Sequence, residues 1–248
     1  MRLSLRGLAK RLRQLQGRLH SRMQVRSAMR LGVAAMAVAS VLAPAPALAQ
    51  SDAAVSFFRA AQVNDAGRIK PLLARGLDPN MREPQRGETG LIVALRNDAM
   101  DVFNLLLAQP KIELERQAGN GNTALMMAAF KNNMPAVKAL LVRGAQVNRP
   151  GWTALHYAAS TGALDIMRVL LEHHAYIDAE SPTKVTPLML AAREGQEGAV
   201  KLLLEEGADA SLRDAGFHSD AAEFAERADK PWIAKAIRHH QAEQVMGR

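Results

Sequence analysis

The apolar residues between positions 52 and 245 form short clusters that return at a nearly constant interval. A first cluster begins at an anchor position in each interval, and a second follows at helical spacing, as at Ile166, Val169 and Leu170. Successive anchors lie 34, 34, 30, 33 and 34 residues apart, at Val55, Thr89, Thr123, Thr153, Thr186 and Asp220. Chance clustering does not keep such a register, so the pattern predicts about six units of two short helices and a turn.

Residue types at the ends of the expected helices agree with these units. A threonine at an anchor can accept a hydrogen bond from the first turn of the helix, and Pro187 suits that turn because it lacks an N–H that the turn would leave unpaired. Gly162 and Gly195 are expected to end first helices in the left-handed conformation, and Asn132 can do the same less well. One unit cannot cover its own apolar stripe, so the units are predicted to stack into a continuous core.

The best-formed unit carries Thr186-Pro187-Leu188-Met189-Leu190-Ala191-Ala192, followed by Gly207-Ala208-Asp209. On these motifs the chain resembles the ankyrin-repeat family, and within it exported bacterial ankyrin-repeat domain proteins. The resemblance implies an all-α solenoid of about six helix-turn-helix units with short β-hairpin fingers, forming one domain over residues 50–248. The first unit has Val55 in place of threonine and the last has two extra residues before Asp220. Such departures are expected in end units, which have a single neighbour.

The first 49 residues are typical of an export signal. They hold nine Lys and Arg residues and no acid, then an uncharged apolar run at 31–42, and they end on small residues at Ala47 and Ala49. Cleavage after Ala49 would leave Gln50 first. The apolar run is shorter than the about 20 residues that cross a membrane, so no stable membrane anchor is expected after cleavage. Met23 and Met29 are alternative starts that would give a more compact signal.

A mitochondrial transit peptide is the alternative for this segment. Leu8, Leu12 and Leu15 lie among arginines in an acid-free stretch that would be amphipathic as a helix. Transit peptides rarely combine such a stretch with an apolar run and a small-residue cleavage site. The sequence therefore favours a periplasmic or secreted protein over a mitochondrial one.

The net charge of +8 belongs to this leader and not to the repeats. Nine of the 32 Lys and Arg residues precede residue 50, whereas all 24 Asp and Glu residues follow it, which leaves 23 basic residues in the repeats. A protein that binds phosphates of nucleic acids needs a basic stripe on its folded domain. No nucleic-acid partner is therefore expected.

Candidate chemical sites in the repeats are weak. The absence of cysteine excludes disulfides, thiolate metal sites and a cysteine nucleophile. The family resemblance gives His156 a local structural role, and the adjacent His173 and His174 would point about 100° apart on a helix, which does not chelate a metal. The glycines at 119 and 121 fit a relaxed dinucleotide motif, but no apolar strand precedes them. We expect no enzyme activity, no metal and no cofactor.

The resemblance places variable binding positions on the concave side, in the finger before each anchor and at the end of each first helix. The finger positions are Arg86, Glu88, Asn120, Asn122, Arg149, Pro150, Trp152, Thr183 and Val185. The helix positions are Arg96, Asn97, Phe130, Lys131, Ser160, Thr161, Arg193 and Glu194.

Two aromatic residues on this side make its middle a candidate hot spot. The chain has only ten aromatic residues, and Phe130 and Trp152 fall on adjacent units beside arginines, which is typical of binding hot spots. The turn at 148–153 is three residues shorter than its counterpart in the next unit, so a clipped finger and a notch are expected there. In the alternative interpretation, Trp152 packs on its neighbouring finger. The residues predicted to bind a partner are Arg96, Phe130, Lys131, Arg149, Trp152 and Arg193.

These observations together predict an exported, monomeric repeat protein that binds another protein through its concave face and performs no chemistry of its own. An accessory or chaperone-like factor for an exported enzyme is one alternative. A host-directed effector scaffold is another.

Overall fold

The computed structural model describes residues 45–246, and contacts divide the chain into Met1–Asp52 and Ala53–Arg248. Most of the predicted leader lies outside the described residues. Twelve helices are described: α2 (Ala45–Gln62), α3 (Ala66–Ala74), α4 (Gly90–Arg96), α5 (Met100–Leu107), α6 (Ala124–Phe130), α7 (Met134–Val142), α8 (Ala154–Thr161), α9 (Leu164–Glu172), α10 (Pro187–Glu194), α11 (Glu197–Glu205), α12 (Ala221–Arg227) and α13 (Pro231–Met246).

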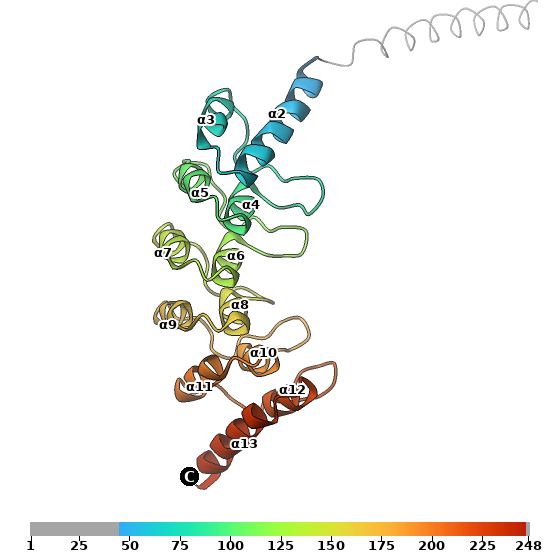
Figure 1. Cartoon of the computed structure of the whole chain (residues 1–248), viewed down its shortest axis with the longest axis vertical. Helices are drawn as coiled ribbons and strands as arrows, with labels where there is room; N and C mark the ends of the chain where they lie inside the picture. The colour runs from blue at the N-terminus through green and yellow to red at the C-terminus, as the bar shows by residue number, and fades with distance from the viewer. Residues whose placement is uncertain (1–44, 247–248) are drawn as a thin grey trace, which may run out of the picture. The chain divides into compact units, whose positions relative to one another are not determined.

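The helices pair in sequence order into six units, as the periodic pattern predicts. The first helices α4, α6, α8, α10 and α12 pack each on the next, and the second helices lie on one side of that column while the long loops project from the other (Figure 1). One apolar core runs through all the units. The all-α ankyrin-repeat solenoid is confirmed.

The helix ends follow the predicted chemistry. The hydroxyls of Thr89, Thr123 and Thr186 each accept a hydrogen bond from the backbone N–H three residues on, at 3.4 Å. Gly162 and Gly195 take the left-handed conformation at φ 68° and 78°, and Asn132 takes it at φ 51°. These residues stop each first helix so that the chain can turn back into the second.

The loops that precede the first helices are hairpin fingers with little β-structure. Among the described residues a single isolated bridge occurs, between Arg82 and Thr89. Neighbouring fingers are instead joined sideways: the N–H of Gly119 donates to the carbonyl of Arg86 at 2.8 Å, and the N–H of Ala215 donates to that of Thr183 at 2.9 Å. Each bond fixes one finger against the next.

The first unit differs from the others because its first helix is long. Helix α2 has 18 residues and starts ten residues before the anchor position Val55, which is exposed inside the helix. Phe57 is fully buried, and Gly90 lies so close that a Cβ there would come within 2.7 Å of the Phe57 ring. The phenyl ring therefore takes space that a side chain at the start of α4 would need.

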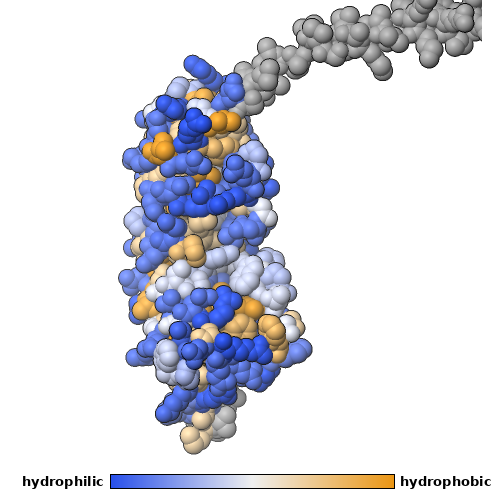
Figure 2. All heavy atoms as spheres, turned by 45° about the vertical axis from the view of Figure 1, so that its right-hand side comes forward, coloured by the Kyte–Doolittle hydropathy of each residue, from blue (hydrophilic) through white to orange (hydrophobic). Residues whose placement is uncertain are grey.

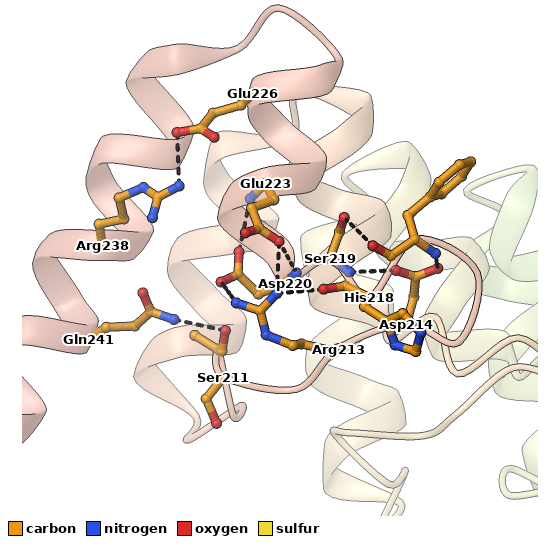
Figure 3. Close-up of polar contacts among 12 residues, drawn as sticks. Ser211, Arg213, Asp214, His218, Ser219, Asp220, Glu223, Glu226, Arg238 and Gln241 are labelled. Atoms are coloured by element: carbon orange, nitrogen blue, oxygen red, sulfur yellow. Dashed lines mark hydrogen bonds and ion pairs between the residues drawn. The ribbon is translucent and has the colours of Figure 1, made fainter.

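Polar contacts hold the last unit together (Figure 3). Arg213 reaches Glu223 at 3.1 Å and Asp220 at 3.4 Å, which ties the finger to α12. Asp214 is buried and accepts three backbone N–H bonds within its finger; although burial raises its pKa, these bonds hold the pKa below its usual value. Gln241 donates to the Ala210 carbonyl at 2.9 Å and so attaches α13 to the preceding turn.

None of the described helices combines the length and apolar character that crossing a membrane requires.

Candidate protein-binding surface

The last residues of the first helices form a row across the stacked units. The position seven residues after each of the last five anchors is occupied by Arg96, Phe130, Ser160, Arg193 and Arg227. We call these five residues the inner-helix row. Because α4, α6, α8, α10 and α12 pack in order, the row runs along one face, with Phe130 the sole apolar member and arginines on both sides of it.

An aromatic cluster lies at the middle of this face. Phe130 is 49% exposed, and its ring meets that of Tyr157 edge-on with centroids 6.1 Å apart. Trp152 is half-buried and packs edge-on against His156 at 5.2 Å. We call Phe130, Tyr157 and Trp152 the aromatic cluster. Figure 2 shows one face of the repeats, on which pale and weakly hydrophobic areas lie between strongly hydrophilic ones.

Two depressions share the rings of Phe130 and Tyr157. The smaller, of about 320 Å³, is also lined by Trp152 and Arg193. The larger, of about 930 Å³, is lined by finger residues of the second and third units. The lining residues that carry polar groups into the larger one are Gln85, Arg86, Glu88, Arg96, Asn120 and Asn122. The aromatic cluster thus adjoins both hollows, and each of them combines apolar surface with polar groups.

The structure brings Phe130 and Trp152 together but holds Arg149 elsewhere. The guanidinium of Arg149 reaches the carboxylate of Glu115 at 2.8 Å and its carbonyl at 3.1 Å, and the Arg149 side chain is only 19% exposed. Arg149 lines neither depression, whereas Arg193 lines the smaller one. The cation beside the aromatic cluster is therefore Arg193, and Arg149 ties its turn to the preceding unit.

The other predicted cations have nearby carboxylates. Arg96 pairs with Glu88 at 2.8 Å, and Lys131 pairs with Asp98 at 3.0 Å. Arg193 pairs with its neighbour Glu194 at 2.8 Å, with both side chains exposed. Exposed pairs of this kind contribute about 1 kcal/mol or less, so Arg193 can exchange its partner at little cost.

Three finger positions expected to be free surface are buried: Glu88, Asn122 and Val185. That expectation was wrong because each of these residues bonds to another residue of the chain, as Glu88 does to Arg96. Asn122 accepts the Tyr157 hydroxyl at 2.6 Å, and the Val185 carbonyl accepts Nε2–H of His156 at 2.9 Å. In these three fingers the earlier residue, Arg86, Asn120 or Thr183, stays exposed.

His156 is a structural residue, as the sequence analysis expected. It is fully buried, and its Nδ1 accepts the backbone N–H of Thr153 at 3.1 Å while Nε2 binds the next finger. Burial lowers the pKa of His156 to about 4, so the ring is neutral at pH 7. It joins the clipped turn to the finger of the fifth unit.

The clipped turn at 148–153 interrupts the sideways bonding of the fingers. Gly151 takes φ 88°, as a tight turn requires. Within the described part of the chain, no backbone-to-backbone hydrogen bond joins this turn to either neighbouring finger. Side chains make its links to neighbouring units: Arg149 bonds to Glu115, Asn148 bonds to His174 and Tyr176, and His156 bonds to Val185. The clipped turn carries Trp152 to the edge of the smaller depression, and a notch in the wall there stays a prediction.

Tyr157 is a part of the site that sequence reasoning missed. It lies four residues after its anchor, three before Ser160 of the inner-helix row, and residues three apart on a helix share a face. Met127 and Leu190 occupy the same position in neighbouring units, and each lines one of the depressions. This i, i+3 spacing was the signal that could have identified it.

Over the residues that the structure describes, no group of three or more His, Asp and Glu side chains is arranged to hold a metal ion. His173 and His174 are exposed at the end of α9.

Comparisons with known proteins agree with this architecture. The sequence matches the family described as ankyrin repeats (3 copies) over residues 57–150 and 125–214. It is 32% identical over 160 residues to the transient receptor potential cation channel subfamily A member 1 of Homo sapiens, covering 60% of this chain and 14% of that protein. It is 33% identical over 153 residues to SH3 and multiple ankyrin repeat domains protein 2 of Homo sapiens, covering 60% of this chain and 8% of that protein. The chain thus spans only a small part of these relatives.

A solved structure also has this fold. It is the solved complex of the predatory endopeptidase Bd0816 from Bdellovibrio bacteriovorus with immunity protein Bd3460. One chain of that complex superposes on this chain with a TM-score of 0.64 and 25% sequence identity. The match covers 74% of this chain and 97% of that one. With the family match extending over more than half of its residues, the chain belongs to the ankyrin-repeat family.

Proposed function

We propose that the chain is an exported protein that binds another protein through the aromatic cluster and the inner-helix row. The observation that carries this proposal is the ring of Phe130, which is half exposed and packs edge-on against Tyr157, in a row otherwise made of arginines and one serine. Aromatic residues and arginines are the residue types that dominate binding hot spots. Ankyrin repeats are protein-binding modules, which agrees with this use of the surface.

Binding on a preformed surface is the mechanism. His156 is buried and neutral, and Glu88 is held by Arg96, so the lining presents aromatic, amide and guanidinium groups. Such groups recognise a partner without a change of covalent bonds. The proposed protein is not an enzyme, and it acts by occupying its partner.

Capture with matched variants tests the site. The mature protein and its Phe130→Ala and Ser160→Ala variants are used as baits in an extract of the organism that makes them, and the captured partner is then titrated by calorimetry. Removing a central hot-spot ring should cost about 2 kcal/mol or more, a loss of about thirtyfold. The serine variant is the control on the same row and should bind as wild type does. Equal affinity of all three proteins would place the interface elsewhere.

Export is proposed from the leader, with cleavage after Ala49. Removal after Ala49 would shorten helix α2 to residues 50–62, which still contain its buried side chains Phe57, Phe58, Ala60 and Ala61. The first turns of the helix are lost, but the part that packs on the core is kept. N-terminal sequencing of the mature protein should begin at Gln50, and recovery of the intact chain inside the cell would argue against export.

The solved complex favours a second candidate, an accessory factor for an exported enzyme. That structure holds an endopeptidase with its immunity protein, and one of its chains is matched over almost its full length. The partner of this chain would then be an exported enzyme that the repeats protect or restrain. Adding the mature protein to the captured partner and following that partner's activity distinguishes this role from simple scaffolding.

A further inference from the structure

We infer that the bound element is an extended segment of the partner protein that carries one bulky apolar side chain and acidic side chains at fixed distances from it. This inference rests on the proposed function, since it names what the aromatic cluster and the inner-helix row would recognise.

The larger depression offers hydrogen-bond donors with little to satisfy them. Arg86 is exposed and forms no ion pair with any residue that the structure describes. The amide oxygen of the buried Asn122 is already taken by the Tyr157 hydroxyl, so the donors left for a partner are mainly those of the arginines. Arg96 contacts the Glu88 carboxylate through Nε and one terminal nitrogen. The other N–H groups of its guanidinium remain to donate to a partner.

The linings of the two depressions hold fewer carboxylates than guanidinium groups, and both carboxylates are already paired. Their carboxylates are Glu88, which is buried against Arg96, and Glu194, which pairs with Arg193. The guanidinium groups of Arg86, Arg96 and Arg193 outnumber them. A carboxylate of a partner therefore gains charge-assisted hydrogen bonds here, whereas a lysine or arginine would meet like charge.

The smaller depression takes the apolar side chain. Its volume of about 320 Å³ is bounded by the rings of Phe130, Trp152 and Tyr157 and by Leu190. An α-helix with its side chains is about 10–12 Å wide, too thick to enter such a hollow, but one large side chain fits it. The apolar anchor of the partner is thus placed against the aromatic cluster.

The spacing of the inner-helix row sets the spacing of the acidic residues. Packed helices lie about 8–10 Å apart and an extended chain advances about 3.3 Å per residue, so one unit corresponds to about three residues. Arg96 lies one unit from Phe130 and Arg193 lies two units away on the other side. An acidic residue is therefore expected about three positions from the apolar anchor in one direction and about six in the other.

Selection from a random library of 20-residue peptides on the immobilised mature protein tests this inference. Selected peptides should share a large apolar residue with Asp or Glu about three positions away. Their affinity should fall about tenfold or more with Arg86→Glu, because reversal of the charge replaces attraction by repulsion. Arg168→Glu, at an exposed position on α9, is the matched control and should leave affinity unchanged.

The outcomes separate this inference from the proposed function. Peptides that need Phe130 but carry no acidic residue, or whose affinity is unchanged by Arg86→Glu, overturn the acidic character of the partner. The proposed binding surface would still stand. Acids spaced about six positions on one side and about twelve on the other would indicate a bound helix and overturn the extended segment. Selection of no peptide overturns a linear segment. Peptides whose binding survives Phe130→Ala overturn both proposals.

Discussion

The buried His156 should make the stability of the repeats depend on pH between about 6.5 and 4. Burial lowers its pKa from 6.5 to about 4 in the folded protein. In that range the unfolded chain takes up a proton that the folded protein does not, so the unfolded state is favoured as the pH falls. The stability that the neutral ring supplies is therefore complete above about pH 6.5 and is lost as the pH falls toward 4.

The size of the effect follows from that difference. Each pKa unit corresponds to about 1.4 kcal/mol, so the folded state should lose about 2 kcal/mol by pH 5 and about 3 kcal/mol by pH 4. The carboxylates with a lowered pKa, Glu83, Asp214 and Glu223, keep their contribution above their ordinary pKa values of 4.5, 3.8 and 4.5 and lose it as the pH falls through their lower folded pKa values. The interval from pH 7 to pH 5 thus isolates the histidine.

Urea unfolding at pH 7 and pH 5 measures the effect directly. The wild type should lose about 2 kcal/mol between the two, while His156→Gln, which does not titrate, should lose much less. His173→Gln, at an exposed position on the same unit, is the control and should keep the wild-type difference. If the wild type and His156→Gln show the same difference, protonation of this buried ring does not govern the pH dependence.

Further predictions concern the core and the first unit. Leu170→Ala, which removes a fully buried side chain, should lower the free energy of unfolding by about 2–5 kcal/mol. Arg193→Ala should change it by about 1 kcal/mol or less. Chemical denaturation checks both, and a larger loss for Arg193→Ala would refute the assignment of buried and exposed positions in the repeats. Gly90→Ala should cost about 1–3 kcal/mol because its methyl group would collide with Phe57. Gly67→Ala has room and should be neutral or stabilising by up to about 1 kcal/mol, so equal melting of the two variants would contradict the close packing.

The fold could be predicted because its determinants are local. The caps at Thr89 and Thr123 and the left-handed Gly162 and Gly195 act within a few residues of themselves, so their types reveal the helix ends. The apolar register identified the stacking, since a unit that cannot bury its own stripe must share it. Only the long helix α2 departed from the pattern, because the first unit has no neighbour whose packing would fix where its helix begins.

The candidate site was less predictable because side chains choose partners across units. Glu115 lies 34 residues before Arg149 and removes it from the binding surface. Asn122 receives the hydroxyl of Tyr157 from 35 residues away, which buries a position expected to be free. The sequence placed Phe130 and Trp152 on one face, and the structure adds the ring of Tyr157 and the cation Arg193 to the same hollow.

The clipped turn has a mechanical consequence for the surface that it borders. Fingers on either side of it are coupled by main-chain bonds, from Gly119 to Arg86 and from Ala215 to Thr183, so each pair resists spreading as a block. Between the blocks, in the part of the chain that the structure describes, the coupling rests on side chains, those of Asn148, Arg149 and His156 among them. The lateral stiffness of the finger edge is therefore lowest beside Trp152, and a partner that wedges a side chain there can part the two blocks without breaking a main-chain hydrogen bond.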